Sequence, residues 1–192
     1  MKKFIWLSMG IIVLAIFLAM GSQTAVAGEF TLSSTQIQAG GQMPMAQVFD
    51  SFGCTGKNIS PELHWSGVPK ETKSLALTVY DPDAPTGSGW WHWLIFNIDP
   101  RTAGLPANAG DVNAHLAPAG CVQSRTDFGT TGYGGPCPPP GDKPHRYIFT
   151  LFALDVARLD LDENTPAAMV GFNLNQHTIG KAQMTALFGR KK

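Results

Sequence analysis

The chain alternates between short apolar runs and segments rich in Gly, Pro, Asn and Asp, which is typical of a protein built mainly from β-strands. Three of the runs carry β-branched and aromatic residues, and almost every position in them is apolar. Runs of this length and composition are typical of strands that are covered on both faces. We therefore predict buried strands at residues 74–80, 93–98 and 147–154, and shorter strands at 30–34 and 46–49.

One segment, residues 165–176, has the pattern of a helix. Thr165 is the expected N-cap, because its hydroxyl can accept from a free amide of the first turn, and Pro166 suits the first helical position. The residues expected to share the apolar face of this helix are Ala168, Met169 and Phe172.

The remaining segments are less regular. Residues 179–188 fit a strand and a helix equally well, and residues 99–142 hold many Gly and Pro residues with little periodicity. An irregular stretch of that length in a compact domain is usually functional or disordered. The expected fold class is all-β dominated: a two-sheet antiparallel β-sandwich with one or two peripheral helices.

The amino terminus has the layout of a secretory signal peptide. Lys2 and Lys3 precede an apolar run at residues 4–20, and the small residues Ala25-Val26-Ala27 follow it. This order of charge, apolar run and A-x-A-like site predicts cleavage after Ala27. A retained membrane anchor is the alternative, although the run is at the lower limit of length for a bilayer span. We expect residues 1–27 to be the signal peptide and 28–192 a single domain, periplasmic or secreted, without stable membrane insertion after cleavage.

Charge and cysteine content narrow the classes of partner and cofactor. The full chain has 14 basic and 14 acidic residues, and loss of both leader lysines would leave it slightly acidic. Nucleic acids and anionic membrane surfaces are bound through basic patches, so neither is an expected partner. The three cysteines, Cys54, Cys121 and Cys137, lack the paired spacing of a zinc site, so one disulfide and one free thiol are expected in an oxidising compartment. We expect no metal and no other cofactor.

Candidate chemistry begins where the buried strand 74–80 ends. The sequence D-P-D-A-P at residues 81–85 places Asp81 and Asp83 on either side of a proline, in a rigid segment. Asp-Pro pairs often only mark turns. However, W-W-H-W follows at residues 90–93, so His92 stands among three tryptophans, a composition suited to the wall of a small-ligand pocket.

A second candidate loop, residues 132–141, is rich in Gly and Pro and leads to His145 and Tyr147. It starts like a G-x-G-x-x-G fingerprint, but Cys137 replaces the third glycine and prolines replace the helix, so a dinucleotide site is excluded. The loop around Gly135 and Pro136 could present backbone amides to an anion, or it could be only a rigid connector. Neither G-x-S-x-G nor H-E-x-x-H is present, so the sequence offers no hydrolase motif and we do not expect an enzyme.

At these two motifs the chain resembles the phosphatidylethanolamine-binding (Raf-kinase-inhibitor-like) family, in its bacterial secreted branch. The resemblance is carried by D-P-D-A-P with the downstream Trp-His, by G-G-P-C-P-P-P-G-D-K-P-H-R-Y at residues 134–147, and by C-T-G-K-N-I-S-P at residues 54–61. It extends from about residue 30 to about residue 188. Cys121 has no counterpart that we can place in the family pattern.

The resemblance implies a two-sheet antiparallel fold with a small pocket for phosphate-like or carboxylate groups. The residues that correspond by motif position to a ligand-binding pocket are Asp81, Asp83, His92, His145 and Tyr147, with Gly135 and Pro136 at its rim. We expect Tyr147, backbone amides and, if they are partly protonated, the two histidines to donate to the anion. The two carboxylates would orient the histidines from behind or accept from a ligand ammonium group. A neighbouring carboxylate favours the charged imidazolium and burial against tryptophan disfavours it, so the sequence leaves the charge state of His92 and His145 open.

The partner implied is a small anionic ligand. Modulation of another protein, such as a protease or a host factor, is the alternative, and a hydrolase is less favoured.

The family motifs also bear on the disulfide, because both Cys54 and Cys137 lie within them. The pair Cys54–Cys137 is favoured, and a local Cys121–Cys137 loop is the main rival.

Overall fold

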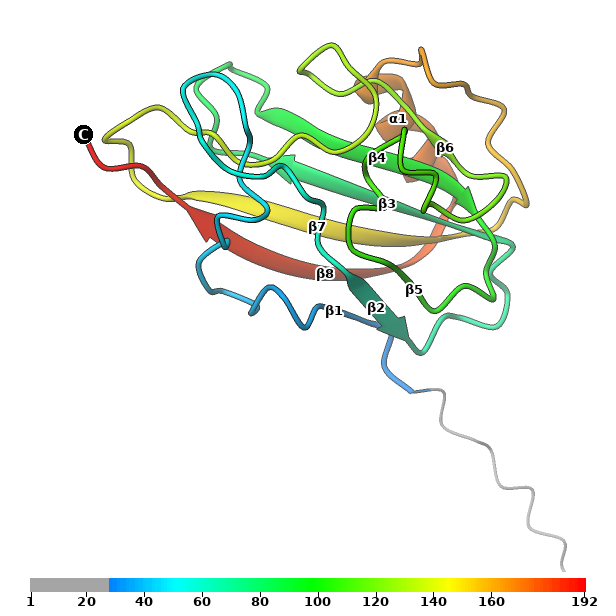
Figure 1. Cartoon of the computed structure of the whole chain (residues 1–192). Coiled ribbons are helices and arrows are strands. Elements are labelled where there is room, and N and C mark those ends of the chain that lie inside the picture. The colour runs from blue at the N-terminus through cyan, green and yellow to red at the C-terminus, as the bar shows by residue number, and fades with distance from the viewer. Residues whose placement is uncertain (1–27) are drawn as a thin grey trace, which may run out of the picture.

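The computed structural model describes residues 28–192, and the predicted leader, residues 1–27, lies outside the described residues. A five-stranded antiparallel sheet forms the centre of the domain, in the order β6-β4-β3-β7-β8 (Figure 1). Its strands are β3 (Ser74–Asp81), β4 (Trp90–Ile98), β6 (Val122–Gln123), β7 (His145–Leu154) and β8 (Thr178–Phe188). A smaller antiparallel sheet, in the order β1-β2-β5, contains β1 (Thr31–Ser33), β2 (Leu63–Ser66) and β5 (Gly104–Leu105).

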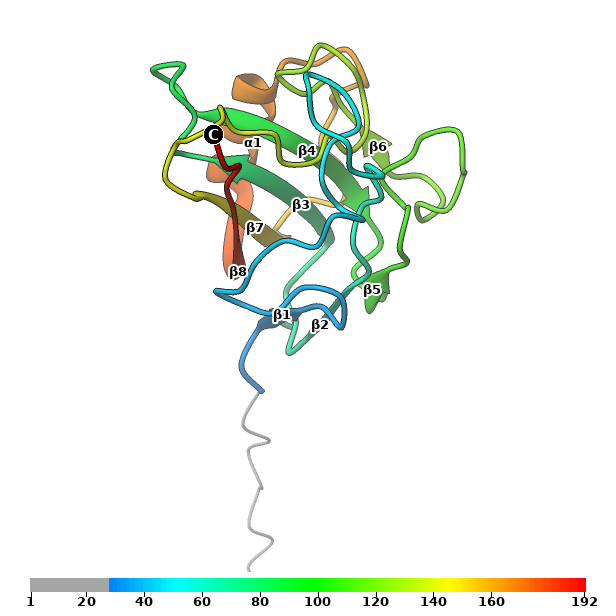
Figure 2. The same cartoon turned by 60° about the vertical axis from the view of Figure 1, so that its left-hand side comes forward.

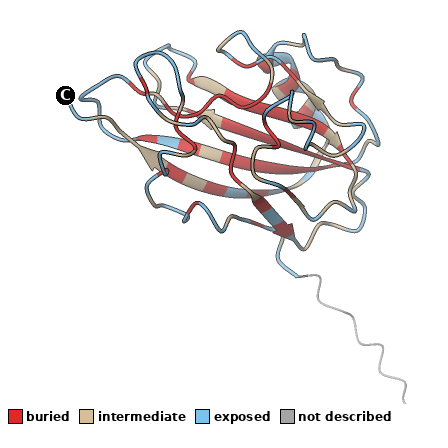
Figure 3. Ribbon diagram, in the orientation of Figure 1, coloured by how far each residue is buried: buried red, intermediate tan, exposed pale blue. Residues whose placement is uncertain are grey.

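The two sheets and one helix form three layers. Alternate residues of β3 point to opposite faces, so Leu75 and Leu77 pack towards the small sheet, whereas Ala76 packs towards helix α1 (Ala167–His177). The helix and the small sheet therefore cover opposite faces of the large sheet (Figures 1 and 2). Both faces of β3 and β7 are buried as a result (Figure 3), and the predicted antiparallel sandwich with a peripheral helix is confirmed.

The predicted strand at residues 46–49 is wrong. This segment forms turns, and its backbone groups bond to loops instead of to a strand: Asn58 N, on the loop that follows, donates to Val48 O at 2.8 Å, and Phe49 N donates to the distant Pro136 O at 3.1 Å. Its apolar side chains suggested a strand because they are buried, but a loop can also bury them. The undecided segment 179–188 is the greater part of strand β8, which pairs along the whole of β7.

The predicted N-cap and buried face of the helix are also wrong. The Thr165 hydroxyl is engaged with Asp162, and the residue at the N-cap is Pro166, which offers no side-chain acceptor. Met169 and Phe172 are 51% and 59% exposed. The helix is apolar on several sides, so its sequence allowed either face, and the residues that it buries against the sheet are Ala167, Val170 and Leu174. Within residues 28–192, no helix has the length and apolar content needed to cross a membrane.

Candidate functional site

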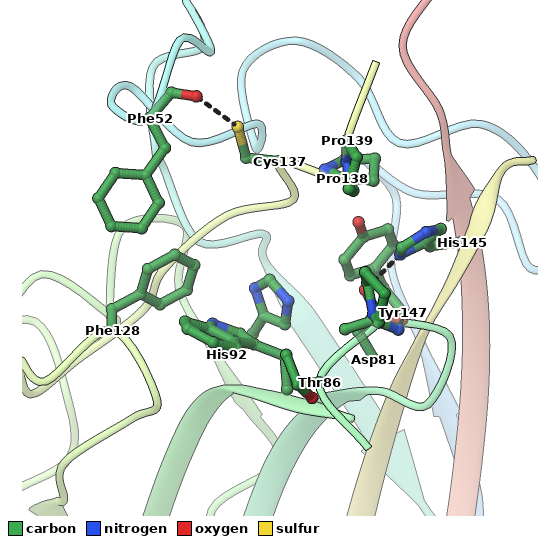
Figure 4. Close-up of a pocket in the computed structure, with 13 residues that line it drawn as sticks. Phe52, Asp81, Thr86, His92, Phe128, Cys137, Pro138, Pro139, His145 and Tyr147 are labelled. Atoms are coloured by element: carbon green, nitrogen blue, oxygen red, sulfur yellow. Dashed lines mark hydrogen bonds and ion pairs between the residues drawn. The ribbon is translucent and has the colours of Figure 1, made fainter. Parts of the chain in front are cut away.

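Three strand ends meet at one edge of the large sheet. Strand β3 ends at Asp81, opposite Trp90 at the start of β4, and β7 begins at His145. Because β3 is antiparallel to both neighbours, its last residues lie beside the first residues of β4 and β7. A cavity of about 150 Å³ lies at this edge (Figure 4).

The cavity has a small polar section and a larger apolar one. Four of the seven predicted ligand-binding residues line it: Asp81, His92, His145 and Tyr147. Most of the remaining wall is aromatic or proline, from Phe52, Pro85, Trp90, Phe128, Pro138 and Pro139. The strand ends thus bring together the candidates that lie on β3, β4 and β7.

Asp81 is buried and all its hydrogen bonds are internal. Its Oδ1 accepts from the backbone amides of Asp83 at 2.8 Å and Ala84 at 3.1 Å, so it fixes the turn that leaves β3. Its Oδ2 accepts from Nδ1 of His145 at 2.8 Å, and Nε2 of that ring lies 3.5 Å from Asp142 Oδ2. Asp81 therefore orients His145, in the manner expected from the sequence.

His92 is held by a backbone carbonyl. Its Nδ1 lies 2.7 Å from Gly134 O, and because a carbonyl can only accept, Nδ1 carries a proton. Burial lowers the pKa of His92 to about 4, although the Gly134 carbonyl, the charge of Asp81, the Gly135 carbonyl and the charge of Asp127 all act in the opposite direction. Burial prevails, so the imidazole is neutral at pH 7. The sequence had left this charge state open.

Tyr147 contributes a buried hydroxyl that has no hydrogen-bond partner within the described residues. Burial, and then the charge of Asp81, raises the pKa of this phenol, so the group keeps its proton and is available as a donor. The indole Nε1 of Trp90, another cavity-lining residue, is likewise buried without a partner in residues 28–192. Such groups are uncommon in native proteins and often mark a place where a ligand or water belongs.

Asp83 does not line the cavity. Its carboxylate binds Arg146, accepting from the backbone amide at 2.9 Å and from the guanidinium at 2.7 and 2.9 Å. Chiefly because of the side-chain hydrogen bond with Arg146, the pKa of Asp83 is lowered to about 2. This pair lies in a separate, open groove together with Asp142 and Lys143. Asp83 was expected among the ligand-binding residues, either behind the histidines or beside a ligand ammonium group, and the structure places it outside this cavity, paired with Arg146.

Gly135 and Pro136 do not line the cavity either. The Gly135 amide donates to Asn58 Oδ1 at 2.7 Å, and a Cβ on this residue would lie 2.1 Å from the carbonyl oxygen of Gln47. Pro136 O accepts from the amide of Phe49. The residues on either side of this pair contact the site instead: the Gly134 carbonyl accepts from His92, and Cys137 lies in the cavity wall. Gly135 and Pro136 therefore fix this loop against residues 47–58.

The rim of the cavity is tied in two ways. Cys54 and Cys137 form a disulfide with a Cα–Cα distance of 5.9 Å, which confirms the favoured pairing and leaves Cys121 free. Arg190 joins the same two loops, donating from Nε to Pro138 O at 2.6 Å and from Nη1 to Gly53 O at 2.9 Å. Arg190 is therefore a structural residue of the rim.

Two phenylalanines of the cavity wall, Phe52 and Phe128, were not predicted from the sequence. The Phe128 ring lies 5.3 Å from the His92 ring and 4.4 Å from Phe49 (centroid distances). Phe52 is 66% exposed at the mouth and has a φ of 53°, which is rare for a bulky residue. Both lie on loops, where no periodicity marks a wall position. Among residues 28–192, no cluster of three or more His, Cys, Asp or Glu side chains could hold a metal ion.

Comparison with known proteins gives one family. The model of the family described as phosphatidylethanolamine-binding protein matches residues 33–189. UPF0098 protein YbcL of Escherichia coli (strain K12) is 47% identical over 177 residues, which is 92% of this chain and 97% of that protein. UPF0098 protein YbhB of the same strain is 50% identical over 157 residues, covering 82% of this chain and 98% of that protein.

Solved structures agree with these sequence relatives. The crystal structure of E. coli YbcL has a TM-score of 0.84 and 49% identity, and covers 85% of this chain and 100% of that chain. The homologue CT736 from Chlamydia trachomatis has a TM-score of 0.70 and 31% identity, and the match covers 84% of this chain and 98% of that chain.

Proposed function

We propose, from the premise that the chain belongs to the phosphatidylethanolamine-binding protein family, that its cavity binds a phosphate-like or carboxylate group of a small ligand. The observation that carries the proposal is the Tyr147 hydroxyl, a buried donor without a partner among the described residues in the wall of a cavity. A buried polar group left unpaired costs about 1–3 kcal/mol, so a ligand oxygen at this position would recover that free energy.

The size of the cavity favours a single small group. A cavity of about 150 Å³ is large enough for a benzene-sized molecule, and this one has that volume. A phosphate or carboxylate group would fit within it, and the rest of a larger ligand would leave through the mouth, past the exposed ring of Phe52. The proposed ligand is therefore an anionic head group with a substituent that projects outwards.

Asp81 would repel an anion if its charge faced the ligand. Instead, each of its oxygens already accepts hydrogen bonds, one from two backbone amides and the other from His145. These donors offset much of the carboxylate charge locally, so that Asp81 can line the cavity with its oxygens already engaged. The hydrogen-bonded pair of Asp81 and His145, the Asp81–His145 dyad, would thus hold His145 in the wall of the binding site.

The proposal is tested by calorimetric titration of the protein with inorganic phosphate and phosphoethanolamine. Tyr147→Phe removes only a hydroxyl that has no partner, so it should leave folding stability unchanged and weaken phosphate binding about tenfold or more, the usual effect of losing a hydrogen bond to a charged group. Tyr80→Phe is the matched control, because the Tyr80 hydroxyl donates to Ser88 O and the residue does not line the cavity. Equal affinities for Tyr147→Phe and the parent would place the site elsewhere.

Modulation of another protein is the second candidate. It is favoured by the exposed Phe52 at the mouth and by exposed Val112 and Leu116 on the long irregular segment. A protein partner captured by the parent but not by Phe52→Ser, together with no phosphate binding, would support this candidate. Turnover of a phosphate or carboxyl ester by the same preparation would instead support a hydrolase.

We further propose that the mature domain is periplasmic or secreted, from the leader pattern and the Cys54–Cys137 disulfide.

A further inference from the structure

His92 is fixed in one tautomer. Its Nδ1 donates to the Gly134 carbonyl at 2.7 Å, and within residues 28–192 the ring makes no other hydrogen bond. The ring is 3% exposed and packs at near right angles to Phe128 and Tyr147, with centroid distances of 5.3 and 5.1 Å, so it has little freedom to turn. In the neutral ring, Nε2 is therefore an acceptor with a lone pair and no proton.

The cavity thus offers a mixed set of hydrogen-bonding groups. The Tyr147 hydroxyl and the Trp90 indole are donors without a partner among residues 28–192, and His92 Nε2 is an acceptor. A ligand that satisfies all three must accept two hydrogen bonds and donate one. A fully deprotonated oxyanion can only accept.

We infer that this site selects oxyanions that carry their own acidic proton, such as the monoanion of a phosphate or phosphonate monoester, over sulfate and sulfonate groups of the same shape. The inference rests on the proposed function and specifies the ligand class for the same cavity. The P–OH group would donate to His92 Nε2, while the other oxygens would accept from Tyr147 and Trp90. A sulfate ester has the same single negative charge but no proton near pH 7, so one of its oxygens would face the lone pair of Nε2.

Sulfate could bind only if His92 took a proton from solvent. With a pKa of about 4 for His92, that requirement weakens binding about a thousandfold at pH 7. A phosphate monoester has a second pKa of about 6, so about a tenth of it already carries the proton at pH 7. The expected preference for phosphate is therefore about a hundredfold at pH 7. It should fall to about tenfold at pH 5, where His92 is easier to protonate and the ester is almost fully monoanionic.

The charges around His92 are part of this balance. Asp81 on β3 and Asp127, on the loop between β6 and β7, both favour protonation of the ring. His145 and Tyr147 on β7 line the same cavity. Burial outweighs the two carboxylates in the free protein. A bound anion would add a further negative charge beside the ring, and this increases the demand for a proton between the ligand and Nε2.

The test is calorimetric titration of the parent protein with methyl phosphate and with methyl sulfate, two ligands of the same shape, at pH 7 and pH 5. We expect methyl phosphate to bind about a hundredfold more tightly at pH 7 and about tenfold more tightly at pH 5. Equal affinity for the two esters at pH 7 would overturn the inference and leave the proposed function standing. If neither ester binds, this inference fails and so does the proposed function for phosphate-like groups.

A variant locates the selectivity on His92. His92→Phe keeps an aromatic ring but removes the acceptor, so the preference for methyl phosphate should be lost. His177→Phe is the matched control, because His177 pairs with Asp155 at the end of α1, away from the cavity. If His92→Phe fails to fold, the Nε2 resonance of the parent replaces it: on binding methyl phosphate it should shift towards that of a hydrogen-bonded nitrogen. A full preference in folded His92→Phe, or an unshifted Nε2 resonance, would overturn the assignment to His92.

Discussion

Lowering the pH should destabilise the protein through His92. The pKa of this ring is about 4 in the folded protein, because it is buried, against 6.5 in the unfolded chain. The unfolded chain therefore binds a proton more readily, so the contribution of His92 to stability is complete above pH 6.5 and is lost as the pH falls towards 4. Each pKa unit corresponds to about 1.4 kcal/mol, which gives a loss of about 3 kcal/mol between pH 7 and pH 4.

The assay is urea unfolding of the parent and of His92→Gln at several pH values between 7 and 4. A glutamine amide can still donate to the Gly134 carbonyl but does not titrate, so the variant should lack about 3 kcal/mol of the pH dependence of the parent. His177→Gln, outside the cavity, controls for the loss of an imidazole. Identical pH profiles for the parent and His92→Gln would show that the buried ring is not held neutral and that Nε2 is not an acceptor.

Three further predictions concern the dyad, the disulfide and the leader. His145→Ala should weaken phosphate binding about ten- to a hundredfold. Asp81→Ala should lower both binding affinity and stability further, because two backbone amides and one imidazole lose their acceptor. Unchanged unfolding and binding of Asp81→Ala would contradict this. Replacing both Cys54 and Cys137 by alanine should lower the free energy of unfolding by about 4–5 kcal/mol in the chain-entropy model, since the bond spans a sequence separation of 83, and a loss below about 1 kcal/mol in urea titrations would count against it. N-terminal sequencing of extracytoplasmic protein should begin just after Ala27, whereas a full-length chain in the membrane fraction would show that the leader is retained.

The parts of the fold that follow from local sequence were predicted well. Residues 74–80 form a buried strand because nearly every side chain there is apolar, and a strand at the centre of a sheet is covered on both faces. Strand β8 could not be assigned, because Ala182, Met184 and Ala186 alternate as in a strand but are residue types that favour a helix. Its structure is decided by pairing with β7, which is a long-range contact. Residues 46–49 were misassigned for a different reason: loop residues 56–59 and Pro136 take their backbone hydrogen bonds, so a buried apolar segment forms turns instead of pairing as a strand.

The site shows the same division. Asp81, His92, His145 and Tyr147 could be proposed from motifs at strand ends, because antiparallel pairing brings such ends together. The position of Asp83 could not be predicted in this way. Its neighbour across the sheet edge, Arg146, binds the carboxylate and turns it out of the cavity. The competition between burial and nearby carboxylates at His92 also depends on packing that the sequence does not specify.

The most direct test of the binding proposal is a crystal of this protein soaked in inorganic phosphate. We expect phosphate in the cavity at the sheet edge, with one oxygen at hydrogen-bonding distance, about 2.7 Å, from the Tyr147 hydroxyl. We also expect a second oxygen within reach of His92 Nε2. Phosphate found only in the open groove beside Lys143 and Arg146, with an empty cavity, would contradict the proposed binding site.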